Sequence, residues 1–171
     1  MLNVGILGAS GFTGVELLRL CAAHPHFNVT YATGDTQAGT LARSLYPSLS
    51  ANYPNLVFEE FSLEKALQCD VLFLALPHEA SLELVPQLYS KVKLVVDLSA
   101  AYRLKNASLY PKWYGFEHTH PDLIEHAVYG LPEINREQLH SARLIATPGC
   151  YVTAASLALS PLVAAGVIQA E

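Results

Sequence analysis

A cysteine stands directly before an apolar, helix-forming run near the end of the chain. It lies in the segment TPGCYVT, Thr147–Thr153, which continues into alanines and leucines. The first turn of a helix carries unpaired N–H groups and a partial positive charge, and both favour a thiolate over a thiol. The Pro-Gly pair predicts a tight turn that leaves the sulfur unshielded. We therefore predict that Cys150 is a nucleophile rather than a small apolar residue that fills a helix N-terminus.

A helix start alone does not fully activate this thiol. It contributes up to about 1–2 kcal/mol toward ionisation, so Cys150 needs a second cationic or basic group, usually a histidine. The other two cysteines have different settings. Cys21 falls on the inward face of an expected helix, and Cys69 stands just before an expected strand. We expect both to be small core residues.

A glycine motif near the N-terminus has the spacing of a phosphate cradle. It follows an apolar run, Leu2–Leu7, and precedes a helical pattern that starts at Val15. Glycines in a strand–turn–helix setting let the backbone approach a pyrophosphate, which rests on the helix N-terminus. The spacing is GxxGxxG rather than GxGxxG, and the alternative is a glycine-rich turn without a ligand. The predicted cofactor contacts are Gly8, Ser10, Gly11, Phe12, Thr13 and Gly14.

Residues after the second expected strand, 28–33, should lie near the adenosine ribose of a bound dinucleotide. NAD-binding proteins usually place an acid there, and NADP-binding proteins avoid it. Thr33, Thr36 and Arg43 could serve a 2′-phosphate, whereas Asp35 could hold the 2′-hydroxyl of NAD. Residues 28–43 therefore leave both cofactors open.

Apolar strands and helical stretches alternate along the chain. Buried strands are expected at 71–76, 94–98 and 143–146, with a helix at 80–88. This alternation predicts an α/β fold with a doubly wound, mostly parallel, Rossmann-like sheet. Ligands of such sheets collect at the carboxyl ends of the strands.

Polar residues follow the expected strands and should meet at that edge. The segment Leu76-Pro77-His78 is predicted to line the cofactor site, although His78 could simply begin the next helix. Arg103 could clamp a phosphate or carboxylate, although composition alone favours a surface arginine. Glu133 could orient a substrate amine or amide, or sit on a solvated turn.

Composition narrows the functional class. The 171 residues are 51% hydrophobic and 15% charged, with a formal net charge of −5. An acidic chain without basic clusters argues against nucleic acid as a partner. The apolar stretch 154–168 is too short and too interrupted to span a bilayer. Three cysteines and the absence of a charged start predict a cytoplasmic protein. His118 and His120 lack a third metal ligand at a diagnostic spacing, so we predict no metal site and a hydrated loop.

Together these motifs resemble one family, N-acetyl-gamma-glutamyl-phosphate reductase of arginine biosynthesis. The tyrosine after Cys150 and the threonine two residues further on are similar to the active-site pattern of that family. Aspartate-semialdehyde dehydrogenases share the architecture but usually carry asparagine at the position of Gly149. The matching segments are spread over nearly the whole chain: Gly8–Gly14, His24–His26, Leu76–Glu79, Asp97–Ser99 with Arg103, Trp113–Gly115, Tyr129–Glu133 and Ile145–Pro161.

The resemblance implies NADPH-dependent reduction of N-acetyl-glutamyl 5-phosphate to N-acetyl-glutamate 5-semialdehyde. Cys150 would attack the acyl phosphate and form a thioester, Arg103 would contact the phosphoryl group, and Ser99 and Glu133 would face the substrate. NADP as cofactor is implied by the resemblance and not by residues 28–43. The alternatives are aspartate-semialdehyde dehydrogenase, a carrier-protein-linked aminoadipyl reductase, and a non-catalytic NADP-binding module.

The resemblance also implies a second α/β domain, which supplies a catalytic histidine, further substrate contacts and most of the subunit interface. None of the seven histidines here matches that histidine. We therefore expect 1–147 to form the dinucleotide-binding domain and 148–171 to begin the second domain. The chain is expected to be an incomplete part that binds NADP weakly or moderately and turns over poorly or not at all alone. The full-length parent is expected to be a homo-oligomer that acts on a small molecule without a membrane partner.

Overall fold

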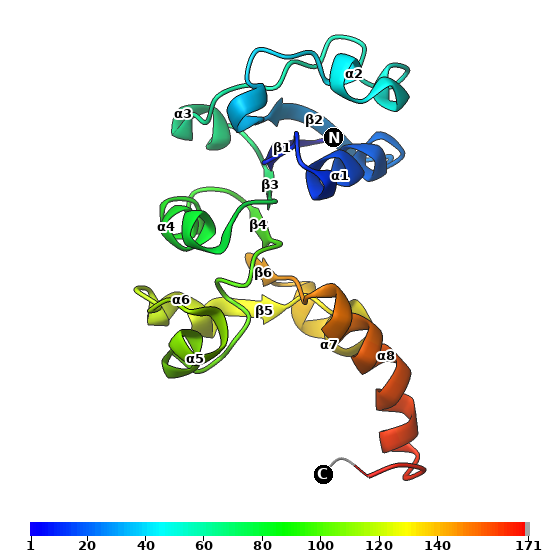
Figure 1. Ribbon diagram of the computed structural model, residues 1–171, viewed down its shortest axis with the longest axis vertical. Coiled ribbons are helices and arrows are strands. Elements are labelled where there is room, and N and C mark those ends of the chain that lie inside the picture. The colour runs from blue at the N-terminus through cyan, green and yellow to red at the C-terminus, as the bar shows by residue number, and fades with distance from the viewer. Residues whose placement is uncertain (170–171) are drawn as a thin grey trace.

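The computed structural model describes residues 1–169. Six strands in this range form a single sheet in which all strands are parallel (Figure 1). The spatial order of the strands is β2-β1-β3-β4-β6-β5, and every pairing is parallel. The predicted doubly wound, Rossmann-like architecture is confirmed. The strands are β1 (Leu2–Leu7), β2 (Phe27–Ala32), β3 (Val71–Leu74), β4 (Leu94–Asp97), β5 (Ala127–Tyr129) and β6 (Leu144–Ala146).

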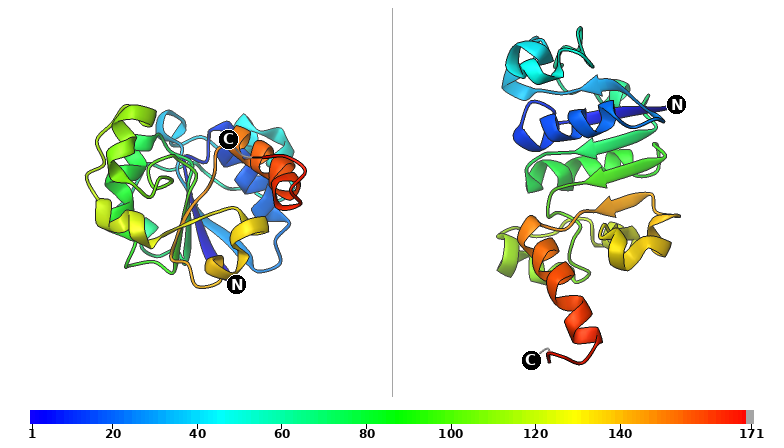
Figure 2. Two further views of the ribbon diagram at one scale, coloured as in Figure 1. Left: turned by 90° about the horizontal axis from the view of Figure 1, so that it is seen from below. Right: turned by 90° about the vertical axis from the view of Figure 1, so that its right-hand side faces the viewer.

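Helices connect the strands because a parallel pair needs a long crossover. α4, α5 and α6 lie on one side of the sheet, and α1 and α8 lie on the other (Figure 2). The α-helices are α1 (Phe12–Ala22), α2 (Ala42–Leu45), α3 (Leu63–Ala66), α4 (His78–Leu88), α5 (Tyr110–Tyr114), α6 (Pro121–His126), α7 (Pro132–Leu139) and α8 (Cys150–Ala164). Single 3-10 turns are η1 (Asp35–Gln37), η2 (Pro47–Leu49) and η3 (Ala107–Leu109).

The core lies on both faces of the sheet, which explains why the central strands read as continuous apolar runs. One buried cluster contains Leu18 of α1 and Phe58 and packs on one face of the sheet. The other contains Val85 of α4 and packs on the opposite face. Cys21 and Cys69 are each 5% exposed, so their prediction as core residues is confirmed. Burial raises the pKa of both thiols.

Several element boundaries differ from the sequence-based expectation. β3 ends at Leu74 and β4 at Asp97, before the expected ends at 76 and 98, and α1 begins at Phe12. Apolar residues such as Leu76 continue past the end of the strand because they line a cavity. Residue type alone does not distinguish an apolar residue in a buried strand from one that lines a cavity. β5 was not expected, since three residues are too few to give a strand pattern.

α8 reaches away from the sheet (Figure 1), and each of its residues is exposed or half-buried. Val152 and Leu159 are 52% and 49% exposed, which leaves apolar surface uncovered along this helix. Within residues 1–169, no helix combines the length and apolar character needed to cross a membrane.

Candidate active site

The glycine turn between β1 and α1 is tightly packed at both ends and open in the middle. Gly8 has φ +82°, and a Cβ there would lie 2.3 Å from the carbonyl oxygen of Ala75. A Cβ at Gly14 would lie 2.3 Å from the carbonyl oxygen of Gly8. A Cβ at Gly11 would meet nothing closer than 3.6 Å. Gly8 and Gly14 are thus required by the turn itself, whereas Gly11 leaves the helix start accessible, as a pyrophosphate needs.

Alanine substitutions separate these two roles. We expect Gly14→Ala to lower the free energy of unfolding by about 1–3 kcal/mol, because its Cβ overlaps the backbone of the turn. Gly11→Ala should change it by no more than about 1 kcal/mol, since this N-cap position has room. Urea denaturation of both variants tests this. Equal destabilisation by the two substitutions would contradict this account of the turn.

A cavity of about 820 Å³ runs along the glycine turn and past the ends of β2 and β3. Six of the predicted cofactor residues line it: Gly8, Ser10, Gly11, Thr33, Leu76 and Pro77. Asp35, Glu60 and Phe61 line it as well. Glu60 and Phe61 could not be predicted from the sequence, because they come from an irregular segment before α3 that carries no motif.

Three of the five remaining predicted cofactor residues lie outside the lining of both cavities, whereas Gly14 is buried in the turn and Thr13 lines a second cavity. Phe12 is 92% exposed at the start of α1, and Thr36 is exposed on η1. His78 begins α4, and its Nδ1 accepts a hydrogen bond from the backbone N–H of Ala100 at 3.0 Å. This bond fixes the loop that follows β4. Contacts of Phe12, Thr36 and His78 with a cofactor stay predictions.

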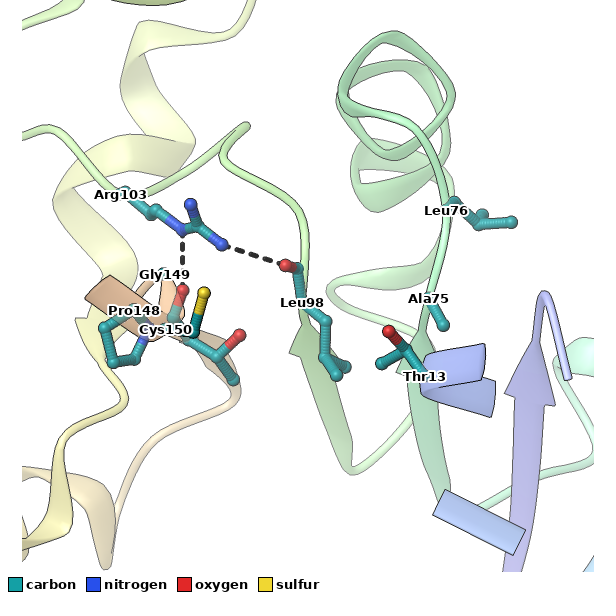
Figure 3. A pocket seen from close by; sticks show the side chains of 9 residues that line it. Thr13, Ala75, Leu76, Leu98, Arg103, Pro148, Gly149 and Cys150 are labelled. Atoms are coloured by element: carbon teal, nitrogen blue, oxygen red, sulfur yellow. Dashed lines mark hydrogen bonds between the residues drawn. The ribbon is translucent and has the colours of Figure 1, made fainter. Parts of the chain in front are cut away.

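A second cavity, of about 470 Å³, contains the Cys150 thiol (Figure 3). Cys150 is the first residue of α8, as predicted, and it is exposed. Figure 3 shows its sulfur pointing toward the guanidinium of Arg103. Thr13, from the first turn of α1, lines the same cavity. Ala75 and Leu76 line both cavities, so the thiol and the glycine turn lie at one edge of the sheet.

Arg103 connects the two loops that carry this site. Its Nε donates to the carbonyl oxygen of Thr147 at 2.7 Å, and its Nη2 donates to that of Leu98 at 2.9 Å. Among the described residues, no hydrogen bond is made by Nη1, which would lie 3.4 Å from a Cβ at Gly149. Arg103 is therefore half-buried and braced rather than a free surface arginine, and it has one edge left for an anion.

Asp97 and Ser99 shape the loop that positions Arg103. The Asp97 carboxylate accepts hydrogen bonds from the Ser99 N–H at 3.0 Å and the Ser99 hydroxyl at 2.8 Å. The Ser99 oxygen also accepts from the Ala101 N–H at 3.0 Å. Burial raises the pKa of Asp97, although these donors oppose that shift. Ser99 is thus engaged within its own loop, and its contact with a substrate stays a prediction.

Two other predicted positions lie outside this cavity. Glu133 is the second residue of α7 and is exposed, so its role in substrate binding stays a prediction. The hydrated loop predicted around His118 is wrong, since His118 is only 9% exposed and its Nε2 donates to the carbonyl oxygen of Ala101 at 2.8 Å. The loop prediction failed because the fold places His118 next to the buried carbonyl group of Ala101, which takes the place of water as its hydrogen-bond partner. No group of three potential metal ligands occurs within 1–169.

The exposures of the three cysteines predict selective alkylation. Iodoacetamide should modify Cys150 alone in the folded chain, because Cys21 and Cys69 are buried. The reaction should be slow at pH 7, since no histidine is among the described residues that line the thiol cavity. Mass spectrometry of tryptic peptides over time tests both points. Rapid modification at pH 7, or early modification of Cys69, would be the contrary result.

Comparison with known families matches residues 3–142 to the semialdehyde dehydrogenase, NAD binding domain family. The chain belongs to this family. A Rossmann-like NAD(P)-binding domain of the semialdehyde dehydrogenases accounts for the glycine turn, the parallel sheet and the cavity that runs along both.

Full-length relatives are also similar over this whole chain. N-acetyl-gamma-glutamyl-phosphate reductase of Pseudomonas fluorescens is 46% identical over 100% of the chain and 50% of the relative. LysW-L-2-aminoadipate/LysW-L-glutamate phosphate reductase of Sulfurisphaera tokodaii is 48% identical over 99% of the chain and 48% of the relative. The resemblance to the first group is therefore confirmed, and the second is equally similar. The chain spans about half the length of these relatives.

Among solved structures, aspartate semialdehyde dehydrogenase with NADP from Candida albicans superposes with a TM-score of 0.71 at 19% identity. The match covers 96% of this chain and 47% of that one. At this identity the likeness establishes the shared fold alone.

Proposed function

We propose that this chain is the dinucleotide-binding, nucleophile-bearing part of an acyl-phosphate reductase. One observation carries the proposal: a single cavity holds the Cys150 thiol, the free edge of Arg103 and Thr13 from the first turn of α1, directly after the glycine turn. This cavity adjoins, through Ala75 and Leu76, the cavity of about 820 Å³ along the glycine turn, which is called the dinucleotide cavity below. A nucleophile, an anion-binding cation and a cofactor cradle at one edge are what the reduction of an acyl phosphate requires.

In the proposed reaction the Cys150 sulfur, as thiolate, attacks the acyl carbon of the substrate. The bond from that carbon to the phosphate oxygen breaks, inorganic phosphate leaves with the electron pair, and a thioester remains on Cys150. Arg103 binds the phosphate through Nη1, while its two other contacts keep the guanidinium in place. A reduced nicotinamide, when bound along the glycine turn, supplies the hydride that, with a proton, converts the thioester into an aldehyde and frees the thiol.

The proposed substrate is N-acetyl-glutamyl 5-phosphate, reduced to the semialdehyde in arginine biosynthesis. The 46% identity to the Pseudomonas fluorescens reductase supports it. The second candidate is an aminoadipyl or glutamyl phosphate held on a carrier protein, which the 48% identity to the Sulfurisphaera tokodaii reductase favours. NADP is the cofactor that the resemblance implies, and the acidic residues around the end of β2 are the observation against it.

Domain organisation and assembly belong to the same proposal. Residues 1–147 would form the dinucleotide-binding domain, and 148–171 would begin a second domain that covers the apolar side chains of α8. Residues 170–171 of this segment lie outside the described residues. The full-length parent would be a cytoplasmic homo-oligomer.

The reverse reaction tests this proposal. The protein assayed would join this segment to the second half that its relatives have. Phosphate-dependent reduction of NAD⁺ or NADP⁺ would be measured with N-acetyl-glutamate semialdehyde, aspartate semialdehyde and a carrier-linked aminoadipate semialdehyde. We expect the first to react fastest. Equal turnover by the wild type and Cys150→Ser would show that Cys150 is not the nucleophile, and dinucleotide binding without any turnover would instead indicate a non-catalytic dinucleotide-binding module.

A further inference from the structure

The dinucleotide cavity is acidic beside the end of β2. Asp35 of η1, Glu60 before α3 and Glu83 of α4 all line it, and all three are exposed. No lysine or arginine is among the described residues that line this cavity. Asp35 and Glu60 thus bring two carboxylates to the end of β2, where a Rossmann-type fold holds the adenosine ribose, and Glu83 adds a third to the same cavity from α4.

The groups that could have bound a 2′-phosphate are engaged or lie elsewhere. The Thr33 hydroxyl is buried and accepts a hydrogen bond from the Gly8 N–H at 2.9 Å. Thr36 and Arg43 are exposed and outside the cavity lining. Lys65, on the nearby α3, is paired with Glu59. None of these residues offers the 2′-phosphate of NADP an available cation inside the cavity.

Asp35 is held in position by its backbone. Its φ of +47° is the one positive value at a non-glycine residue within 1–169. The Ala38 N–H donates to the carbonyl oxygen of Asp35 at 2.9 Å, and the Gln37 N–H donates to that of Gly34 at 2.8 Å. Aspartate and asparagine tolerate this left-handed conformation better than other residues with a side chain. The turn therefore fixes a carboxylate at the edge of the cavity.

An aromatic side chain lies in the part of the cavity lining where the adenosine would bind. Phe61 is 49% exposed, although it is a large apolar residue, and it lines the same cavity as Asp35. A ring of this kind offers a flat surface on which an adenine can stack. Phe61 would contribute equally to NAD and NADP, because the two share the adenine.

We propose that Asp35, supported by Glu60, makes this site select a dinucleotide with a free 2′-hydroxyl, so that NADH binds more tightly than NADPH. A carboxylate accepts a hydrogen bond from a ribose hydroxyl, and it repels a 2′-phosphate. The inference rests on the proposed function in one respect, namely that a dinucleotide occupies this cavity. It departs from the family resemblance, which implies NADP.

Fluorescence titration of the chain with NADH and with NADPH at low salt tests the selection directly. We expect NADH to bind at least about tenfold more tightly, which corresponds to about 1.4 kcal/mol. Asp35→Asn keeps a residue that tolerates positive φ and removes the charge, so it should bring the ratio of the two dissociation constants close to one. Asp122→Asn on α6 removes an exposed carboxylate outside the cavity lining and should leave the ratio unchanged.

Two further measurements separate the possible outcomes. Phe61→Ala should weaken both nucleotides by a similar factor, and rising ionic strength should tighten NADPH more than NADH, because salt screens the repulsion. Tighter NADPH binding by the wild type, or a ratio that Asp35→Asn leaves unchanged, would overturn the selection alone. Failure of both nucleotides to bind a folded chain, as judged by circular dichroism, would overturn the proposed function and the selection together.

Discussion

Cys150→Ser should reduce acyl transfer from acetyl phosphate to the chain by at least about a thousandfold. The thiol is exposed at the first residue of α8, beside the free edge of Arg103. A serine hydroxyl at the same place stays protonated at neutral pH and is a far weaker nucleophile. Intact-protein mass spectrometry measures the acetyl group gained, and a colorimetric assay measures the inorganic phosphate released.

Cys69→Ala is the matched control for this result. It also removes a thiol, but Cys69 is buried beneath β1 and lines neither cavity. We expect this variant to accept acetyl groups at the rate of the wild type. Acetylation that persists in Cys150→Ser, or that disappears in Cys69→Ala, would show that Cys150 is not the acceptor.

Arg103→Lys should slow the same acyl transfer by about a hundredfold, because a lysine keeps the charge but lacks the planar fork. The guanidinium donates in two directions, to Thr147 and to Leu98, and still presents Nη1 to the cavity. One ammonium group does not meet all three demands. The second readout is the alkylation rate of Cys150 by iodoacetate relative to iodoacetamide. This ratio should fall, because an ammonium that satisfies the carbonyl oxygens of Thr147 and Leu98 no longer presents a donor to the negatively charged reagent.

Arg143→Lys provides a control with a similar structural loss. The Nη2 of Arg143 donates to the carbonyl oxygens of Val92 at 3.1 Å and of Ser90 at 3.5 Å, so it also braces neighbouring backbone. It precedes β6, whereas the thiol follows that strand. Both lysine variants should lower the melting temperature, but only Arg103→Lys should change the reagent ratio. An unchanged ratio in Arg103→Lys would leave Arg103 with a purely structural role.

The sequence by itself determined the fold class, the glycine turn and the position of Cys150 at the start of a helix. These features depend on short-range patterns: apolar runs for buried strands, glycines where the backbone approaches itself, and a Pro-Gly turn before a helix. Gly8 and Gly14 confirm this reasoning, because a side chain at either position would overlap backbone atoms within or beside the same turn. Patterns of this kind lie in consecutive residues, so they can be recognised without knowledge of the rest of the chain.

The tertiary structure alone decided which polar groups are available. Ser99 and His78 are used to hold the loop that carries Arg103, and His118 is buried against that same loop. Glu60 and Phe61 join the dinucleotide cavity from a segment without any motif. Ser99 has its partners, Asp97 and Ala101, two residues away, but each of the other outcomes depends on a partner more than fifteen residues away or on a cavity formed by several elements. Whether a polar side chain faces a ligand or a neighbouring backbone group is set by that packing, because a buried hydrogen-bonding group must be satisfied by whichever partner the fold brings to it.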